Sequence, residues 1–531
     1  MKKRTIILSI FIVAALASCM LLLSSCGRDK AEEHLSFTSN GDGTCYVSGI
    51  GDCTLEEVLI PQVSPKGDKV TAIADKAFYE CFTLKKVTIP PTVTKIGSDA
   101  FRGCIYLTEI NIPASVKTIG DRVLMDCKAL NRISVDGSNT SFSSLGNCLI
   151  DLNAKSIIAG CNSSNIPNRD FVTSIADYAF FDLNNLTSVN IGDYVTTIGD
   201  HAFDECDSLA AVQFGGSVKE IGDYAFAACS NLKSVTFAET DTLESIGDFA
   251  FHACDDLESF KFPTTLKTVG QGAFWSCNSF KAAHTDSLSA WAQIEFGSTS
   301  ATPLNYGSLY CKNEIVTDVV IDNGVEKIGA HAFYNAKNIS SVTIPDSIVS
   351  IGDYAFGNCI LIEEISLGKG VKSVGEYAFS GCSSLTNVSF PAATESIGEY
   401  ALYNCNALES IAVAEGNAKY SSKGNCLIDI EGKTLIQGCN SSNIPSDGSI
   451  TSIASYAFYN CQGLKKITLP KSLTYIGFKA FAGCANLTDV VFEDASGWYV
   501  YESLQDKDGE AANDISAEIS GIYSEYYWRK K

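Results

Sequence analysis

Apolar residues recur along most of the chain with a period of 23 residues. In the unit that begins at Leu84, the apolar positions Leu84, Val87 and Ile89 face inward, and the last two keep the two-residue spacing of a β-strand. Pro90 then ends the strand, because proline has no N–H to donate. A second short apolar segment opens at Ile96. The pattern therefore predicts two short strands in each unit.

Each unit then closes on a small residue, usually Ala, followed by a large apolar one. This large residue recurs 14 times, at Phe78, Phe101, Leu124, Phe180, Phe203, Phe226, Phe251, Phe274, Phe333, Phe356, Phe379, Leu402, Phe458 and Phe481. The residue after the second strand is Gly in 11 of the 14 units and Ala in the others, which indicates close packing at that point. An acid often follows, as in Asp200 and Asp223, and we expect it to cap a short helical turn.

One such unit cannot bury its own apolar side, so the units must stack. We therefore expect a β-rich solenoid of parallel short strands and helical turns with a 23-residue repeat. Two units are enlarged, at about 128–175 and 406–453, and contain the same residue strings 278 positions apart. This offset indicates a duplicated block. Each enlarged unit is expected to add a pair of short strands closed by a turn rich in Asn, Gly and Ser.

The domain organisation follows from these landmarks. We expect a signal peptide at 1–25, a linker and cap hairpin at 26–60, the solenoid at 61–490 and a C-terminal cap at 491–531. Within the solenoid, residues 278–325 form an irregular stretch that we expect to add coils without breaking the stack. Caps are needed because a bare terminal coil would expose both its core and a strand edge.

The repeated unit, Leu-x-x-Val-x-Ile-Pro, then Ile-Gly, then Ala-Phe-x-x-Cys, resembles that of the BspA-type leucine-rich-repeat family. The resemblance covers about residues 35–531 and implies a leucine-rich-repeat fold. It also implies a bacterial surface protein linked to adhesion, coaggregation or the binding of host matrix proteins. It supplies no catalytic residue. Leu183 and Ala336 replace the unit cysteine, which indicates that this cysteine is a packing choice and not a ligand.

The N-terminus has the features of a secretory signal, with basic residues at 2–4 and an apolar stretch at 6–23. Leu23, Ser24 and Ser25 before Cys26 resemble a lipobox, which would make Cys26 the lipidated first residue of the mature chain. Cys19 is the alternative lipidation site. An uncleaved membrane anchor and simple secretion also stay open. We expect a membrane-anchored lipoprotein of the bacterial envelope that is exposed at the surface.

The charge excludes a nucleic-acid partner. The chain carries −22, and removal of the first 25 residues, which hold three bases and no acid, leaves −25. Nucleic acid would be repelled. The simplest explanation of this acidity is that it keeps the protein soluble.

The cysteines and histidines have structural interpretations. Of 21 cysteines, 12 occupy the unit position and are expected to form a ladder of buried free thiols. Possible disulfide pairs are Cys45 with Cys53, Cys148 with Cys161, and Cys426 with Cys439. His201 and His331 stand where Tyr usually precedes Ala-Phe and look like surface substitutions. We find no catalytic motif, and predict no enzyme activity, metal or cofactor.

The outward slot between the two inward residues of the first strand is the candidate binding surface, here called the strip. It holds Thr88, Asn111, Ser134, Asn190, Gln213, Thr236, Lys261, Thr343, Ser366, Ser389, Ala412, Thr468 and Val491. Eleven of these 13 residues are polar and only Lys261 is charged, on a strongly acidic protein. The ligand-binding candidates are Thr88, Asn111, Asn190, Gln213, Thr236 and Thr343. The alternative is that small polar residues simply tolerate a solvated strand.

We therefore expect a non-catalytic, adhesin-like binding protein that recognises an extracellular protein or glycan, such as a host matrix protein. The alternative is a structural spacer or assembly scaffold in the cell envelope.

Overall fold

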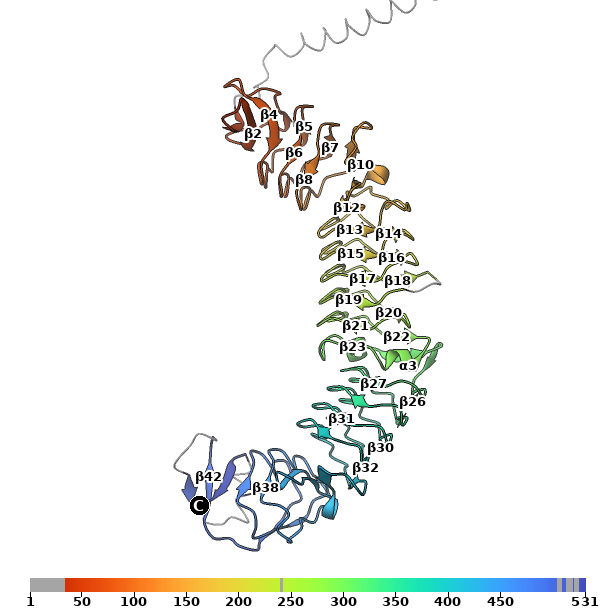
Figure 1. The fold of residues 1–531 in the computed structure, drawn as a ribbon, viewed down its shortest axis with the longest axis vertical. Coiled ribbons are helices and arrows are strands. Elements are labelled where there is room, and N and C mark those ends of the chain that lie inside the picture. Colours follow the sequence, from red (N-terminus) through yellow and green to blue (C-terminus); the bar gives the residue numbers. More distant parts are fainter. Residues whose placement is uncertain (1–33, 239–241, 504–508, 512–518, 520–524) are drawn as a thin grey trace, which may run out of the picture. The chain divides into compact units, whose positions relative to one another are not determined.

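The computed structural model describes residues 34–238, 242–503, 509–511, 519 and 525–531. It contains two compact units, Met1–Asn165 and Ile166–Lys531, which are described separately. In each unit short strands stack coil upon coil, as a β-solenoid with little helix (Figure 1). The predicted solenoid fold is confirmed.

The first unit contains two stacks of parallel strands. The first strands of successive repeats are β3 (Glu57–Leu59), β5 (Lys86–Thr88), β7 (Glu109–Ile112) and β9 (Arg132–Val135). The other sheet has the order β1 (Ser36–Ser39), β2 (Thr44–Gly49), β4 (Lys69–Ile73), β6 (Lys95–Ile96) and β8 (Thr118–Ile119). β1 and β2 form an antiparallel hairpin, and β2 pairs in parallel with β4. The residues expected to form an N-terminal cap thus cover one edge of this sheet.

The second unit repeats this arrangement over more coils. Its first-strand sheets are β14 (Ser188–Ile191), β16 (Ala211–Phe214) and β18 (Ser234–Phe237); β20 (Ser259–Phe262), β22 (Ala282–Thr285), β24 (Ser308–Cys311) and β25 (Glu314–Ile315); β26 (Asp318–Val320), β28 (Ser341–Thr343), β30 (Glu364–Ser366), β32 (Asn387–Phe390) and β34 (Ser410–Val413); and β39 (Lys466–Leu469) and β41 (Asp489–Phe492).

The second strands of the repeat form their own sheets in this unit. They are β13 (Ser174–Ile175), β15 (Thr197–Ile198), β17 (Glu220–Ile221), β19 (Ser245–Ile246), β21 (Thr268–Val269) and β23 (Glu295–Phe296); β27 (Lys327–Ile328), β29 (Ser350–Ile351), β31 (Ser373–Val374) and β33 (Ser396–Ile397); and β38 (Ser452–Ile453) and β40 (Tyr475–Ile476). Pairing is parallel and in register, for example Ile198 with Ile221, so each inward side chain meets its counterpart in the next coil.

The segment that closes each coil is a turn and not a helix, which corrects the expected helical turn. Its backbone contains left-handed residues on both sides of the Ala-Phe pair, such as His201 (φ 54) and Glu205 (φ 61). Such residues cannot belong to a right-handed helix. The described helical segments lie elsewhere: α3 (Leu288–Trp291), η1 (Leu145–Asn147), η2 (Pro303–Asn305) and η3 (Lys423–Asn425).

The core is a column of stacked aromatic rings beside a ladder of thiols. Phe203 and Phe226 stack with ring centroids 5.1 Å apart, and both are fully buried. The unit cysteine donates its S–H to the backbone carbonyl of the large apolar residue in the preceding coil, as from Cys229 to Phe203 O at 3.1 Å. Nineteen cysteines from Cys45 to Cys484 are free thiols, and among them are all six of the possible disulfide partners. The ladder of buried thiols is confirmed, and those pairings are absent.

The glycine after the second strand is required by the preceding coil. A Cβ on Gly222 would lie 2.5 Å from Asp200 Oδ1 and 2.8 Å from Asp200 N. The acid that follows does not cap a helix. Instead, Asp200 Oδ1 accepts the backbone N–H of Asp223 in the next coil at 2.8 Å, and Asp223 Oδ1 accepts that of Asp248 at 2.7 Å. The acids thus join consecutive coils.

The two enlarged units have the same structure. In the first, β10 (Phe142–Ser143), β11 (Leu149–Asp151) and β12 (Ser156–Ala159) pair antiparallel, and β35 (Tyr420–Ser421), β36 (Leu427–Asp429) and β37 (Thr434–Gln437) do so in the second. Asn147 Nδ2 donates to Ser163 Oγ at 3.2 Å, and Asn425 Nδ2 donates to Ser441 Oγ at 3.1 Å. The duplication inferred from the sequence is therefore also seen in the hydrogen bonds.

The irregular stretch interrupts the sheets, and side chains connect the coils on its two sides. β23 ends one sheet and β27 begins another. Trp291, the fully buried last residue of α3, donates its Nε1–H to Ala332 O at 2.7 Å. Glu295 Oε2 accepts the N–H of Ala330 at 2.8 Å. The stack continues through these contacts.

At the C-terminal end, β44 (Tyr527–Lys530) pairs antiparallel with β40 and with β42 (Trp498–Tyr501), and β43 (Glu510–Ala511) pairs with β42. Trp498 and Trp528 are buried there. The exact domain boundaries stay a prediction.

Candidate binding surfaces on the coil stack

In the second unit the strip is a straight row of exposed side chains. Parallel pairing sets Asn190 opposite Gln213, and Gln213 opposite Thr236. All three side chains are exposed, while the residues on either side of Asn190 and Gln213 are buried. Because neighbouring strands lie about 4.8 Å apart, the row presents one polar group per coil at that spacing.

A second row runs over the coils after the irregular stretch. Val320 lies opposite Thr343, Thr343 opposite Ser366, and Ser366 opposite Ser389. Thr343, Ser366 and Ser389 are exposed and uncharged. Thr343 therefore belongs to a different sheet from Asn190, Gln213 and Thr236, and the structure does not bring all the candidates into one row.

The first unit carries the remaining candidates. β5 and β7 pair at Lys86 and Glu109, which sets Thr88 beside Asn111, and both are exposed. Asn111 Oδ1 accepts the hydroxyl of Ser134 from the next coil at 3.0 Å. Cys26 and Cys19 lie outside the described residues. The roles of all these residues stay predictions.

Between the two rows of the second unit the strip changes character. Lys261 lies opposite His284, and His284 opposite Tyr310. Lys261 Nζ is 2.8 Å from Asp286 Oδ2, so its charge is paired. Val320, at the start of the next sheet, is 59% exposed. An ion pair, the rings of His284 and Tyr310, and the exposed Val320 therefore interrupt the neutral strip.

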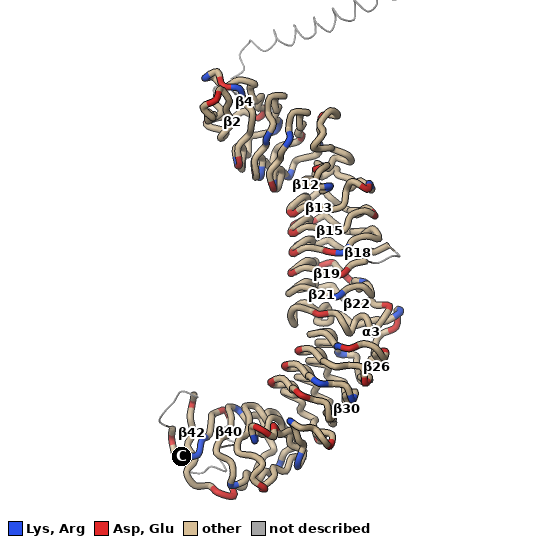
Figure 2. Tube along the Cα trace, in the orientation of Figure 1, with Lys and Arg blue, Asp and Glu red and all other residues tan. Residues whose placement is uncertain are grey.

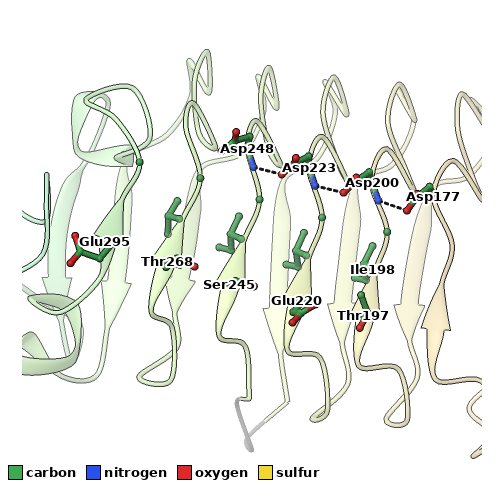
Figure 3. A pocket seen from close by; sticks show the side chains of 18 residues that line it. Asp177, Thr197, Ile198, Asp200, Glu220, Asp223, Ser245, Asp248, Thr268 and Glu295 are labelled. Carbon is green, nitrogen blue, oxygen red and sulfur yellow. Dashed lines mark hydrogen bonds between the residues drawn. The ribbon is translucent and has the colours of Figure 1, made fainter.

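A groove of about 650 Å3 runs along the second strands of the second unit, from Asp177 to Gly297. Figure 3 shows the joined carboxylates Asp177, Asp200, Asp223 and Asp248 along one side of it, and Glu220 and Glu295 elsewhere in its lining. The glycine after each second strand leaves room for it. The groove follows from the packing requirement of the repeat, and its acids already bind the backbone of the next coil.

Next to the acids, the residues before each Ala-Phe pair stack on one another. His201 lies between Tyr178 and Tyr224, at ring-centroid distances of 4.7 and 4.8 Å. His331 stacks on Tyr354 at 5.3 Å. Both histidines are half-buried, so the expectation of plain surface substitutions was wrong. Sequence reasoning noted that Tyr is usual at this position but missed that a 23-residue spacing would stack these rings.

The ionisable groups in and beside these stacked rings have structural roles. Burial lowers the pKa of His331, whose Nδ1 hydrogen-bonds to the carbonyl of Phe296 at 2.8 Å. Burial raises the pKa of Asp204, although His201 Nδ1 lies 2.7 Å from its carboxylate. Within the described ranges, no group of three or more His, Cys, Asp or Glu side chains is arranged to hold a metal ion. In the same ranges, no helix has the length and apolar character needed to cross a membrane.

The comparisons with known proteins identify the repeat. The family model of the BspA type leucine-rich repeat region matches residues 51–166, 154–281, 306–424 and 429–503, with six copies. The chain belongs to this family. The match spans the enlarged units and both compact units, so the resemblance inferred from the repeat is confirmed.

Similar solved structures include leucine-rich proteins from bacteria. One from Bacteroides ovatus is 26% identical, covers 88% of this chain and 94% of its own, and gives a TM-score of 0.42. A leucine-rich cell surface protein from Faecalibacterium prausnitzii is 21% identical, with coverages of 88% and 94% and a TM-score of 0.32. The pneumococcal vaccine antigen PcpA is 16% identical, with coverages of 87% and 96% and a TM-score of 0.30. No curated protein matches the chain.

Proposed function

We propose that this chain is a non-catalytic, surface-anchored binding protein that recognises an extracellular protein or a glycan through the strip. The observation that carries the proposal is the row of exposed, uncharged side chains in register, from Asn190 through Gln213 to Thr236. Membership of a repeat family of this kind supports a binding role.

The chemistry of the row suits a partner with many hydroxyl or amide groups. Amide and hydroxyl side chains both donate and accept hydrogen bonds. A ligand that docks on them desolvates no charge, which would otherwise cost binding energy. Since the contact repeats at every coil, an extended protein segment or a polysaccharide can make several equivalent contacts, each of them weak. This adhesin-like mode requires no moving part and no reacting group.

The experiment is a binding screen with the chain from Gly27 onward against matrix proteins and glycans. The test variant replaces Asn190 and Gln213 by Glu. Its matched control replaces Thr268 and Gln271 by Glu. These two residues are exposed on the other face of the same unit. We expect the test variant to lose affinity through repulsion or an unpaired buried charge, and the control to keep it.

Circular dichroism must show that both variants fold, because exposed strand substitutions usually cost little stability. Full-strength binding by the folded test variant would remove the strip from the site. A chain that binds none of the panel but purifies with its own envelope proteins would instead be a spacer or scaffold.

The anchor is tested separately. We propose Cys26 as the lipidated residue, with Cys19 as the alternative, in a signal of the expected pattern. Cys26→Ala should move the protein from the membrane fraction to the soluble fraction. If the variant stays with the membrane, then either Cys19 or an uncleaved apolar segment holds the chain.

A further inference from the structure

Charge is distributed unevenly along this acidic chain. Residues 66–132 contain 11 basic and 7 acidic residues, a net charge of +4, whereas residues 177–297 contain 5 basic and 18 acidic residues, a net charge of −13. Figure 2 shows this contrast as blue positions among the coils around β4 and red positions along β13 to β21. The first coils are therefore cationic, in contrast to the coils at 177–297.

Three of these cations gather around one tyrosine and one buried carboxylate. Arg122 binds Asp99 in a fork, with Nε 3.0 Å from Oδ1 and Nη2 2.9 Å from Oδ2, and Arg102 Nη1 lies 3.5 Å from Asp99 Oδ1. Lys76 Nζ and Arg102 Cζ lie 5.6 and 5.7 Å from the centre of the Tyr79 ring. Asp99 is only 3% exposed, so it holds the two arginines from the buried side and adds little negative charge at the surface.

Exposed aromatic residues lie on the same turns. Tyr79 is 36% exposed, Phe82 54% and Tyr106 53%. We define the cationic patch as Lys76, Tyr79, Phe82, Arg102, Tyr106 and Arg122. Glu80, exposed next to Tyr79, is an acid at its margin.

The corresponding coils of the second unit have a different surface. The position of Lys76 and Arg122 is occupied there by Tyr178, His201 and Tyr224, which stack on one another. The repeat therefore does not require cations at this position, and their presence in the first coils needs another explanation.

We propose that the cationic patch docks on the anionic lipid headgroups of the membrane that holds the anchor. The proposal rests on the anchor at Cys26. Only seven residues, and thus eight residue-to-residue steps, lie between Cys26 and His34, the first described residue. At about 3.5 Å per residue, such a tether reaches no more than about 28 Å, so the first coils stay close to the membrane surface.

The chemistry of the patch fits such a surface. Guanidinium groups donate to phosphate oxygens in pairs, and tyrosine favours the membrane–water interface, where phenylalanine can add apolar contact. The acidic remainder of the chain is repelled by anionic headgroups. Attraction at the first coils, together with repulsion of the acidic coils of the second unit, would turn the patch toward the membrane.

The test uses the chain from Gly27 onward, without lipid, sedimented with vesicles of phosphatidylglycerol and phosphatidylcholine in equal parts or of phosphatidylcholine alone. We expect binding to the anionic vesicles that weakens as salt is added. Lys76→Glu with Arg102→Gln leaves Arg122 on Asp99 and should weaken binding at least about tenfold. The control, Lys233→Glu with Lys267→Gln, makes the same charge change on exposed lysines of the second unit and should have little effect.

A second variant, Phe82→Ser with Tyr106→Ser, changes no charge and should also weaken vesicle binding. Equal binding to both kinds of vesicle, or an equal loss in the control, would overturn the proposal. So would patch-dependent binding to dextran sulfate without binding to vesicles, which would make the partner an anionic polysaccharide. Because the protein in this assay has no covalently attached lipid anchor, the outcome is independent of the Cys26→Ala fractionation and of ligand binding at the strip.

Discussion

Replacing Phe226 by Ala tests the packing of the coil stack most directly. The ring is fully buried between Phe203, at a centroid distance of 5.1 Å, and Phe251, at 5.4 Å. Phe214 from a first strand meets it edge-on at 5.8 Å. Each coil is thus joined to its two neighbours through this side chain.

The expected loss is large because the cavity cannot collapse easily. A buried Phe→Ala change costs about 3–5 kcal/mol. Three ring contacts, each contributing about 0.5–1.5 kcal/mol beyond the buried area, place this position in the upper part of that range. Since each coil contacts only its neighbours, the loss should be concentrated in the coils around Phe226.

Amide hydrogen exchange, followed coil by coil, measures this local loss, and limited proteolysis should show a new cleavage site in the same region. The matched control is Phe82→Ala, because Phe82 is 54% exposed and its removal should cost less than about 1 kcal/mol. Unchanged exchange and cleavage in Phe226→Ala, or equal effects of both variants, would refute the packing role of the Ala-Phe motif.

Three further predictions concern the other columns. Gly222→Val should lower the melting temperature, because overpacking costs about 1–3 kcal/mol of stability. An unchanged thermal unfolding curve would contradict the close contact between coils. Iodoacetamide should modify the half-buried Cys311 before the buried Cys206, because burial raises the pKa of Cys206 to about 12. Mass spectrometry after treatment of the folded protein measures which of the two cysteines is modified first. The hydrogen bond from Arg122 lowers the pKa of Asp99 below the ordinary value of 3.8. The stability that this pair contributes is therefore present above pH 3.8 and is lost as the pH falls through the lower pKa that Asp99 has in the folded protein. Arg122→Met should remove that part of the acid dependence of unfolding, measured against denaturant at several pH values.

The sequence predicted the parts of the fold that depend on one side chain and its burial. Val87 and Ile89 were expected to face inward because of their spacing, and both are buried. The glycine column was expected because a larger side chain would not fit a close contact, and Asp200 makes that contact with Gly222. The thiol ladder followed from the low cost of burying cysteine. These properties can be inferred within one unit.

The properties that depend on two coils were predicted poorly. Asp200 was expected to bind its own turn, but its carboxylate accepts the N–H of Asp223, 23 residues further on. His201 was interpreted as a surface substitution, although the rings of Tyr178 and Tyr224 enclose it. In both cases the partner is at the same position of the next unit. A repeat pattern aligns such positions in the sequence, but it does not reveal which of them make contact across the stack.

The strip differs from these columns because the fold places little demand on it. The core needs Val189 and Ile191, which are buried, and leaves the outward residue between them, Asn190, free to vary. With 61 acids among 531 residues, 13 positions filled at random would contain one or two acids, and the 13 strip residues contain none. Packing does not exclude acids from an exposed slot, but the low β-propensity of Asp acts against them there. The proposed binding role adds a second reason, because a surface that meets a partner without desolvating charge would also exclude acids, whereas solubility alone favours acids at exposed positions.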